Sequence, residues 1–359
     1  MELFLITAPG LEPFLADEAR EIGLDVTGTI PGGVLVNGDW SDVRTANIQL
    51  RGATRVLARL SSFRAMHLAQ LDKRSRKLPW AEWLLHEIPF RVEATCRKSR
   101  IYHDRAAAQR VTRAVTETLG APYDKNAEVV LKVRIEDDLC TISVDTSGPS
   151  LHKRGIKEQV NKAPMRETLA SLFLRACGFS GDEPVYDPMC GSGTFVIEAA
   201  EMALGLAPGR QREFAFSNLA CATGESAALP ALHQTTQRFY GSDRDQGAIA
   251  MSRANATRAG LSEVCNFECR AVGEIVAPCS EPGLVIVNPP YGKRIGNKGP
   301  LYGLYASLGE RLKSEFAGWR VGLLTSEPGL ARATDLDWAP PGPRIDHGGV
   351  KIQLWQAQL

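Results

Sequence analysis

Short apolar strands alternate with amphipathic helices over the second half of the chain. Helices are expected to begin near Thr194, Gln246 and Leu301. The expected strands occupy residues 184–187, 239–243, 266–272, 284–288 and 320–325. A strand that returns to its sheet through a helical crossover runs parallel to its predecessor, and the helices cover both faces. We therefore expect a doubly wound α/β sheet, to which residues 350–357 can add a final edge strand.

The first 150 residues have a different pattern, in which strands and helices form two smaller α+β units. The first is expected to contain a strand at residues 3–7, a helix ending at Ile22, a strand ending at Gly38 and a helix over Val43–Leu60. The second is expected to contain strands at residues 90–96, 129–136 and 139–145 and a helix over 105–119. Polar residues 152–164 then lead to a helix over 165–177. Because one domain usually has roughly 100 to 200 residues, this chain of 359 is expected to form two or three.

Composition excludes several classes of protein. A hydrophobic share of 44% with 23% charged residues is typical of packed globular chains and argues against wholesale disorder. No apolar run approaches the roughly 18 residues of a spanning helix, and residues 1–14 lack the basic start of an export signal. The eight cysteines include no C-x-x-C pair, which argues against a disulfide framework and a zinc site. We expect a cytoplasmic protein with no metal, no membrane segment and no obligate protein partner.

Positive charge is concentrated in one part of the chain, although the net charge of the whole is only +1. Between Arg44 and Arg113 there are 16 Lys and Arg residues against five Asp and Glu, a net charge of +11, so the remaining residues carry −10. Thirteen of the 16 are arginine, whose guanidinium group binds phosphate oxygens bidentately. This asymmetry indicates a polyanionic partner for one part of the chain. A solvated basic surface is the alternative.

A glycine-rich loop follows the first expected strand of the second half and reads DPMCGSGT over residues 187–194. Such glycines let a ligand approach the backbone, and free N–H groups at a helix N-terminus attract a carboxylate or phosphate. Val196 stands where a dinucleotide fingerprint needs its third glycine, and no Gly-Lys-Ser/Thr of a P-loop follows. Asp243, at the end of the next strand, can bind ribose hydroxyls. The pattern favours a nucleoside with a carboxylate tail, such as S-adenosyl-L-methionine, and a simple tight turn is the alternative.

A second motif, Asn288-Pro289-Pro290-Tyr291, follows an apolar strand. Its two prolines stiffen the segment and force Asn288 out of helical geometry. A planar amino group could donate one hydrogen to the Asn288 side-chain oxygen and the other to the Pro289 carbonyl, while Tyr291 stacks on the ring. These contacts favour the tetrahedral nitrogen that must form when a conjugated amine attacks a sulfonium methyl group. A rigid loop in which Asn288 caps a turn is the alternative.

The two motifs are expected to face one crevice. In doubly wound sheets, ligands bind beyond the carboxyl ends of the strands, at the point where the strand order reverses. The first and fourth expected strands flank that point, and they carry Asp187 and Asn288. The sequence therefore predicts a single site made from a cofactor loop and an amine-binding loop.

Taken together, the motifs carry a family resemblance. The chain resembles the THUMP-domain class I S-adenosylmethionine-dependent RNA methyltransferases, the group that forms N2-methylguanosine in ribosomal or transfer RNA. The resemblance covers nearly the whole length, through APGLEPFLADEA, LRGATRVLARL, CRKSRIYHDRAAAQRV, LHKRG, APMRETLAS, DPMCGSGTFVIEAA, GSDRD and NPPYGKRI. N-P-P-Y alone is shared with adenine and glutamine-amide methyltransferases, whereas its combination with the THUMP segment is much more specific. The resemblance implies a ferredoxin-like domain at 1–60, a THUMP RNA-binding domain at 61–150, a linker and leading helix at 151–180, and a Rossmann-like methyltransferase domain at 181–359.

The resemblance also implies roles for individual residues. The implied cofactor-binding residues are Asp187, Pro188, Cys190, Gly191, Gly193, Thr194, Asp243 and Arg244, with Arg166 and Thr168 from the preceding segment. The implied catalytic residues are Asn288 and Pro289 as amine acceptors, Tyr291 as stacking partner, and Pro290 between them. These enzymes usually carry an acid after the third strand, but here the sequence reads Cys-Arg-Ala-Val over 269–272. Backbone groups or Glu274 would then hold adenine.

A basic loop that contains aromatic residues is the expected RNA contact. The predicted RNA-binding residues are Arg97, Lys98, Arg100, Tyr102, His103, Arg105, Arg110, Arg113, Lys293 and Arg294. Cations follow the phosphates, and Tyr102 or His103 could stack on an unpaired base. A structural role is the alternative for His103. Lys293 and Arg294 directly follow the amine-binding motif, where the phosphates beside a target nucleotide would pass.

The expected function is methyl transfer from S-adenosyl-L-methionine to guanine N2 in 23S ribosomal RNA. A base within a duplex cannot reach a buried crevice, so the target must be single-stranded or flipped. The same chemistry on transfer RNA is one alternative. The other is a non-catalytic RNA-binding or ribosome-assembly factor, for which the missing acid after the third strand is the only indication.

Overall fold

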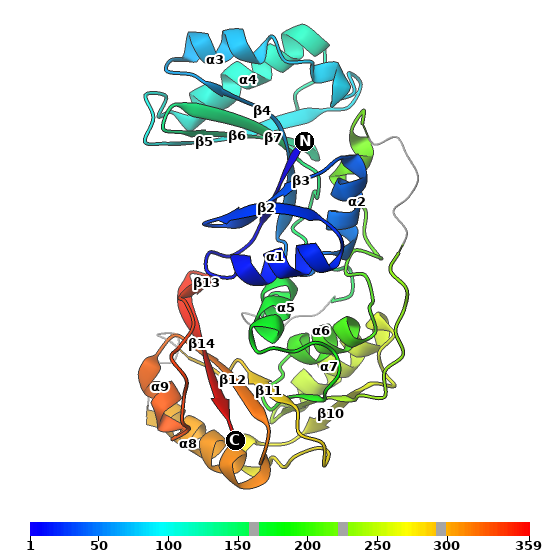
Figure 1. Ribbon diagram of the computed structural model, residues 1–359, viewed down its shortest axis with the longest axis vertical. Coiled ribbons are helices and arrows are strands. Elements are labelled where there is room, and N and C mark those ends of the chain that lie inside the picture. Colours follow the sequence, from blue (N-terminus) through cyan, green and yellow to red (C-terminus); the bar gives the residue numbers. More distant parts are fainter. Residues whose placement is uncertain (158–164, 222–228, 292–298) are drawn as a thin grey trace. The chain divides into compact units, whose positions relative to one another are not determined.

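The chain folds into two units, and each contains one seven-stranded sheet (Figure 1). The computed structural model describes residues 1–157, 165–221, 229–291 and 299–359. Unit 1 consists of Met1–Thr7, Ala16–Leu151 and Arg212–Leu229, and unit 2 of Ala8–Leu15, His152–Gln211 and Pro230–Leu359. Within the described ranges, we find no helix with the length and apolar character needed to cross a membrane.

The first half of the unit 1 sheet has the β-α-β-β-α-β order of a ferredoxin-like fold. Its elements are β1 (Glu2–Ile6), α1 (Glu12–Glu21), β2 (Asp25–Ile30), β3 (Gly33–Asn37), α2 (Trp40–Gln49) and β4 (Arg55–Arg64). Strand β1 pairs antiparallel with both β3 and β4. Asp39 caps α2, since its carboxylate accepts a hydrogen bond of 2.7 Å from the Ser41 N–H. Strand β2 was not predicted, because its sequence DVTGTI is short, polar and largely exposed.

The helix expected over Val43–Leu60 is correct only in its first part. Helix α2 ends at Gln49, and Leu50 already has an extended backbone with a ψ of 125°. The following residues form β4, which pairs with β1 on one side and with β7 (Leu139–Asp145) on the other. The apolar residues of this segment fit a helical period about as well as a strand. Pairing with two neighbouring strands decides the outcome, as tertiary contacts commonly override local preference.

The second half of unit 1 agrees closely with its expected strands and helix. Its elements are α3 (Leu68–Ser75), a 3-10 turn η1 (Trp80–Glu82), β5 (Phe90–Arg97), α4 (Asp104–Leu119), β6 (Val129–Glu136) and β7. The full strand order is β2-β3-β1-β4-β7-β6-β5, and among these described strands β5 and β6 alone run parallel to each other. Asp137 and Asp138 form the hairpin turn with positive φ values of 49° and 63°. Strand β4 joins both halves into one sheet, so the strand pairing marks no boundary at residue 60. The predicted domain boundaries at residues 60, 150 and 180 therefore stay predictions.

Unit 2 contains the expected doubly wound sheet. Its elements are α5 (Glu167–Ala176), β8 (Val185–Asp187), α6 (Thr194–Ala203), β9 (Phe239–Asp243), α7 (Gln246–Ala259), β10 (Cys265–Cys269), η3 (Val272–Glu274), β11 (Leu284–Val287), α8 (Gly299–Glu315), β12 (Arg320–Thr325), α9 (Pro328–Ala333), β13 (Ile345–His347) and β14 (Val350–Gln358). The 3-10 turn η2 (Ala215–Asn218) lies between α6 and β9 in the chain but belongs to unit 1. Strands β10-β9-β8-β11-β12 are parallel in that order, which confirms the predicted fold class. Strand β14 adds antiparallel to β12, and β13 pairs with its first residues. The strand expected over 266–272 ends earlier, at Cys269, before η3.

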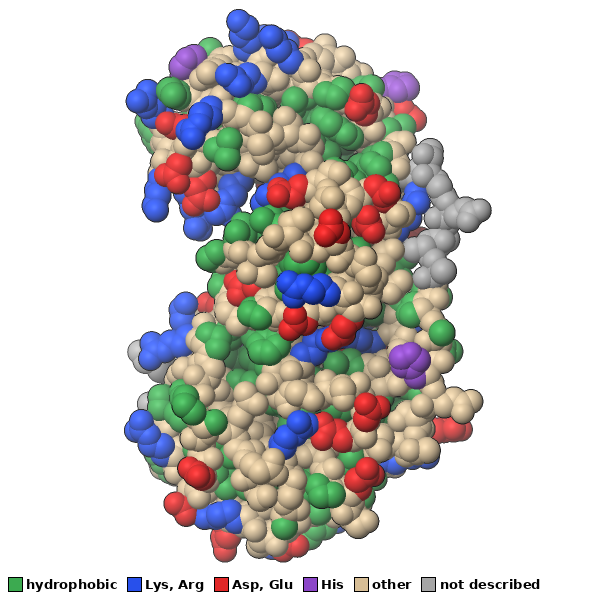
Figure 2. All heavy atoms as spheres, viewed as in Figure 1, with side chains coloured by type: hydrophobic (Ala, Val, Ile, Leu, Met, Phe, Trp, Pro, Cys, Tyr) green, Lys and Arg blue, Asp and Glu red, His purple; other side chains and the backbone are tan. Residues whose placement is uncertain are grey.

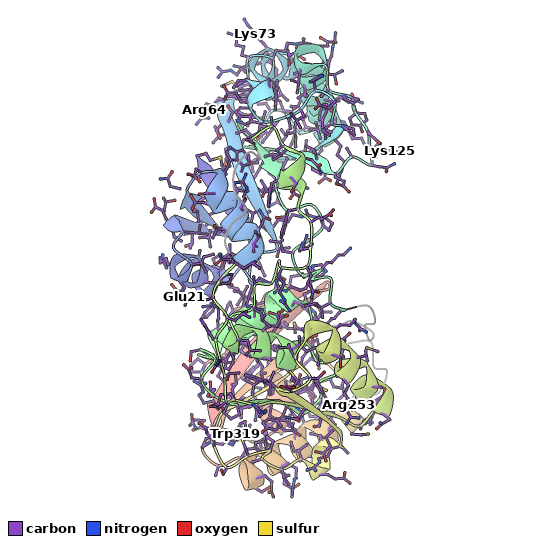
Figure 3. All side chains as sticks on the ribbon, turned by 90° about the vertical axis from the view of Figure 1, so that its right-hand side faces the viewer. Glu21, Arg64, Lys73, Lys125, Arg253 and Trp319 are labelled. Atoms are coloured by element: carbon purple, nitrogen blue, oxygen red, sulfur yellow. The ribbon has the colours of Figure 1, made fainter. Side chains whose placement is uncertain are left out.

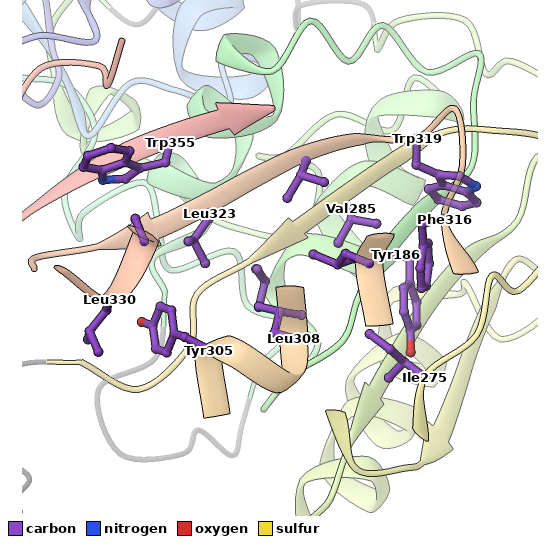
Figure 4. Packing of buried hydrophobic residues seen from close by; sticks show 14 of the residues in the cluster. Tyr186, Ile275, Val285, Tyr305, Leu308, Phe316, Trp319, Leu323, Leu330 and Trp355 are labelled. Carbon is purple, nitrogen blue, oxygen red and sulfur yellow. The ribbon is translucent and has the colours of Figure 1, made fainter. Parts of the chain in front are cut away.

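Helices cover both faces of the unit 2 sheet and bury its apolar strands. On one face, Val285 and Leu323 pack with Tyr305 and Leu308 of α8 in a continuous hydrophobic cluster (Figure 4). On the other face, α5 approaches β12 so closely that a Cβ on Gly322 would lie 2.6 Å from the Cys177 sulfur. Strands buried on both faces read as continuous apolar runs, which is why this part of the fold was predictable.

Two glycines of α8 predict opposite effects of the same substitution. A Cβ on buried Gly309 would overlap the carbonyl oxygen of Thr334, whereas no described atom lies within 4 Å of that position on exposed Gly303. We expect Gly309→Ala to lower the free energy of unfolding by about 1 to 3 kcal/mol, because the backbone after α9 must shift. Gly303→Ala should raise it by up to about 1 kcal/mol through helix propensity. Urea denaturation of both variants tests this, and a stabilising Gly309→Ala would contradict the packing described.

Candidate active site

The glycine-rich loop connects the end of β8 to the start of α6 through two left-handed residues. Gly191 has a φ of 53° and Gly193 a φ of 81°, in the region where other residues are strained. No described atom lies within 4 Å of the place where a Cβ on Gly191 would stand, so its backbone is open to a ligand. A Cβ on Gly193 would lie 3.2 Å from Phe267 and Ser252. The first glycine therefore leaves space, and the second permits close packing.

Polar groups from β9 and α7 hold this loop in place. The carboxylate of Asp243 accepts a 3.1 Å hydrogen bond from the Gly191 N–H, and the Ser242 carbonyl accepts one of 2.9 Å from the Cys190 N–H. The Ser252 hydroxyl donates to the Gly191 carbonyl at 2.8 Å. The side-chain amide of Asn255 on α7 donates to the Ser192 carbonyl at 3.0 Å. Ser252 and Asn255 were not predicted, although buried polar side chains on a helix signal that they have such partners.

Asp187 is a buried carboxyl group beside a second acid. It is 3% exposed, and burial raises its pKa to about 8, with the nearby Asp243 carboxylate adding to the rise. A 3.0 Å hydrogen bond from the Met189 N–H opposes this shift. A carboxyl group in this state favours a cationic neighbour, because an adjacent positive charge would lower its pKa.

The segment before β8 also reaches the loop. The hydroxyl of Thr194, the first residue of α6, lies 3.5 Å from the Met165 carbonyl that it donates to. Arg166 follows as the exposed N-cap of α5, and Thr168 is buried within that helix. Lys157 donates to the Thr194 hydroxyl at 2.5 Å and pairs with Glu167 at 3.0 Å. The structure therefore places the start of α5 beside the loop.

The Asn-Pro-Pro-Tyr loop begins where β11 ends. The side-chain oxygen of Asn288 is buried and has no hydrogen-bond partner among the described residues. Leaving a buried acceptor unpaired costs roughly 1 to 3 kcal/mol, which a bound donor would recover. The Pro290 carbonyl accepts a hydrogen bond of 3.3 Å from Tyr305, and the Tyr291 hydroxyl lies 3.2 Å from Nδ1 of His347. The loop is thus fixed around an acceptor that no described group uses.

Both loops leave the same edge of the sheet. Strands β8 and β11 are parallel neighbours, with Val185 opposite Leu284 and Tyr186 opposite Val285. Strand β9 lies on the other side of β8, so the strand order reverses between β8 and β11. Asp187 and Asn288 consequently follow adjacent strands at their carboxyl ends. Lys293 and Arg294, predicted to lie next to this motif, fall outside the described residues.

Beyond β10 the residues 269–272 include no acid, although the family resemblance led us to expect one there. Cys269 is exposed, and its thiol donates to the Arg244 carbonyl at 3.6 Å. The Arg270 N–H donates to the Asp243 carbonyl at 3.0 Å, and its guanidinium group pairs with Glu268 at 2.6 Å. Glu274 lies in η3 with an exposed side chain. The side chain of Arg244 is also exposed.

The predicted RNA-binding residues of unit 1 lie at the end of β5 and on α4. Figure 2 shows Lys and Arg side chains over the part that contains α3 and α4. Arg97 ends β5, and Lys98 has a left-handed φ of 45°. Tyr102 is 79% exposed, with its ring 5.5 Å from that of His103. Helix α4 carries three further arginines, Arg105, Arg110 and Arg113. Arg113 forms an ion pair with Glu117 at 2.5 Å.

Comparisons with known proteins identify the domains. Residues 154–339 match the family described as "RMKL-like, methyltransferase domain", which is more than half of the chain. The chain belongs to the RMKL-like methyltransferase family. Residues 2–57 of this family member match the RlmL ferredoxin-like domain, and residues 66–145 match the THUMP domain. These matches confirm the resemblance and the three kinds of domain predicted from the sequence.

Curated relatives and solved structures agree with this family. The Ribosomal RNA large subunit methyltransferase K/L of Psychromonas ingrahamii is 33% identical over 92% of this chain and 46% of its own length. That of Syntrophotalea carbinolica is 34% identical over 92% of this chain and 50% of its own length. The chain therefore spans about half the length of these relatives. A possible methylase from Clostridium difficile 630 has a TM-score of 0.87 at 27% identity over 99% of this chain and 97% of its own. The protein SMU.472, solved as a complex with SAH, has a TM-score of 0.89 at 26% identity over 99% and 97%.

Asp187 predicts a pH dependence of stability in this RMKL-like protein. Its pKa is about 8 in the folded state against an ordinary value of 3.8, so between these values the folded chain holds a proton that the unfolded chain has released. The free energy of unfolding should therefore fall as the pH rises from about 5 to about 8, by at most about 1.4 kcal/mol per pH unit from this group. Asp187→Asn should remove that contribution. Urea denaturation of both proteins across this range tests it, and identical pH slopes would contradict the assignment.

Proposed function

We propose that this protein transfers a methyl group from S-adenosyl-L-methionine to N2 of guanine in 23S ribosomal RNA. One observation carries the proposal. The buried side-chain oxygen of Asn288, unpartnered among the described residues, stands at the sheet edge from which the glycine-rich loop also leaves. A buried acceptor beside an open glycine loop suits a reaction in which an amino group must be held next to a bound cofactor.

The residues at this edge fit S-adenosyl-L-methionine. Gly191 leaves its backbone open, and the buried Asp187 favours a positively charged ligand, as the ammonium and sulfonium groups of this cofactor would provide. Residues 187–194 would hold the methionine end, and Asp243 would bind the ribose while it supports the loop. Arg166, Thr168 and Arg244 are proposed as further contacts. When bound, the cofactor supplies an electrophilic methyl group. The SAH complex of SMU.472, which shares this fold, supports the assignment.

The Asn-Pro-Pro-Tyr loop would bind and orient the acceptor amine. Asn288 Oδ1 and the Pro289 carbonyl would each accept one hydrogen of the guanine amino group, while Tyr291 stacks on the base. Two acceptors placed this way draw the nitrogen lone pair out of conjugation with the ring, which the attacking amine requires. Orientation of the amine by this rigid loop would supply a further part of the acceleration.

Ribosomal RNA is the substrate that the comparisons support best. The curated relatives are named ribosomal RNA large subunit methyltransferases, and residues 66–145 match a THUMP domain. The exposed arginines and Tyr102 of unit 1 suit phosphates and an unpaired base. The eight cysteines are all free, as in proteins of a reducing cytoplasm, where we propose that the protein acts.

Removal of the Asn288 side chain should strongly slow methyl transfer. We expect Asn288→Ala to lower kcat by about 100-fold or more, as for the loss of one preorganised electrostatic contact in other enzymes. Cofactor affinity should not change, because Asn288 lies on the Asn-Pro-Pro-Tyr loop of residues 288–291, here called the acceptor loop, and not on the glycine-rich loop. Transfer of tritium from labelled cofactor to ribosomal RNA and calorimetric cofactor titration measure the two effects. Asn266→Ala, an exposed asparagine on β10, is the matched control and should behave as wild type.

The same experiments separate the alternatives. Wild-type activity in Asn288→Ala would show that the amine-acceptor assignment is wrong. Mass spectrometry of digested RNA from a strain that lacks the gene should show one N2-methylguanosine missing from large-subunit RNA. If the deletion strain instead lacks an N2-methylguanosine in transfer RNA, the proposed substrate is wrong. Unchanged RNA together with no cofactor binding would favour a non-catalytic protein.

Charge reversal in the basic loop should weaken RNA binding without affecting the cofactor. Arg97 and Arg100 lie in this loop, and the Arg100 N–H is anchored to Asp138 at 2.8 Å. In Arg97→Glu/Arg100→Glu the slope of log affinity against log salt should fall in magnitude by about 1 to 2, because fewer counterions are released. Salt-dependent RNA binding and calorimetric cofactor titration test this.

A matched control lies at the other end of β5. Lys125 follows Asp124, whose N–H donates to the carbonyl of Phe90, the first residue of β5. Figure 3 shows it on the side of this part opposite Arg64. Lys125→Glu should therefore leave RNA affinity close to wild type. Equal losses in both proteins would indicate a general charge effect and contradict the assigned patch.

A further inference from the structure

A tight hairpin near the C-terminus presents His347 to the acceptor loop. Strands β13 and β14 are joined by Gly348 and Gly349, whose positive φ values of 61° and 81° form a two-residue turn. Asp346 accepts a hydrogen bond of 3.3 Å from the Gly349 N–H. Paired Ile345 and Ile352 are both buried, which anchors the hairpin to the body of unit 2. His347 is therefore held on a well-defined backbone.

The hydroxyl of Tyr291 lies 3.2 Å from Nδ1 of His347, within hydrogen-bond distance. A second contact fixes the preceding residue, since fully buried Tyr305 donates to the Pro290 carbonyl at 3.3 Å. The acceptor loop is thus held at two successive positions by groups from α8 and β13. These contacts join elements that are more than ten residues apart in the chain, so no local motif encodes them.

We propose that His347 is a positioning residue, which holds the ring of Tyr291 in place against the target base. The proposal rests on the proposed function, in which the guanine ring stacks on Tyr291 while its amino group reaches Asn288. Without a contact at its hydroxyl end, a tyrosine ring can swing about its Cα–Cβ bond and shift together with the stacked base. Its hydrogen bond to His347 restrains this motion, so that the base is held with its amine directed to the acceptors.

The imidazole ring offers a matched pair of substitutions. An asparagine side chain carries its polar atoms where Nδ1 stands, whereas a glutamine side chain carries them near the position of Nε2. His347→Asn can therefore keep the bond to Tyr291, and His347→Gln should lose it. Tyr291→Phe removes the same bond from the other partner while it keeps the aromatic ring. Combining it with His347→Gln closes a double-mutant cycle.

We expect His347→Gln and Tyr291→Phe each to lower kcat for RNA methylation by about 3- to 10-fold, the range that one neutral hydrogen bond supports. The double variant should show little further loss, because both changes remove the hydrogen bond that the two side chains share. His347→Asn should recover most of the activity. Cofactor affinity by calorimetry and KM for RNA should remain within about twofold of wild type, since orientation rather than binding is lost.

The outcomes distinguish the two proposals. Failure of the wild-type protein to methylate RNA would overturn the proposed function and the positioning role with it. An active wild type with additive losses in the double variant, or with His347→Asn as poor as His347→Gln, would overturn the positioning role alone. The midpoint of thermal unfolding is measured for every variant. Losses of kcat that only follow falling stability would assign His347 a structural role instead.

Discussion

The parallel pairing of β8 with β11 is the constraint on which the site depends. It begins where the Leu284 N–H donates to the Pro184 carbonyl at 3.0 Å. Any side chain at Gly283 would overlap that carbonyl, so glycine permits the close approach. Once the two strands are neighbours, their carboxyl ends bring the glycine loop and the acceptor loop to one edge. If β8 and β11 paired in another register, each loop could keep its own structure, but the two loops would no longer lie next to each other.

Local sequence predicted the parts of the structure that short-range physics determines. Apolar runs buried on both faces marked the strands of unit 2, and the glycines of the loop marked a backbone that a ligand can approach. The segment after Gln49 was misassigned because pairing of β4 with two distant strands outweighs its helical pattern. The supports from Ser252, Asn255 and His347 were not found, because each acts on a loop far away in the chain.

The connection between α6 and β9 of the unit 2 sheet includes residues that belong to unit 1. The described part of this segment is residues 212–221 and Leu229. There Leu219 forms a β-bridge with Leu84, and the Ala220 N–H donates to the Trp83 carbonyl at 3.0 Å. The Phe216 N–H donates to the Thr146 carbonyl at 3.0 Å. The chain thus leaves unit 2 after α6 and returns to it before β9.

Two groups at the site are in states that cost stability without a ligand. Asp187 is a buried acid kept protonated near neutral pH, and Asn288 holds a buried acceptor that no described group satisfies. If stability alone determined the sequence, both groups would be paired or replaced, because a buried polar group without a partner is unfavourable. A nearby cation would stabilise the Asp187 carboxylate, and a hydrogen-bond donor would satisfy the Asn288 oxygen. The two residues therefore suit the proposed cationic cofactor and the proposed acceptor amine. Their position after adjacent strands is therefore better explained by binding than by folding.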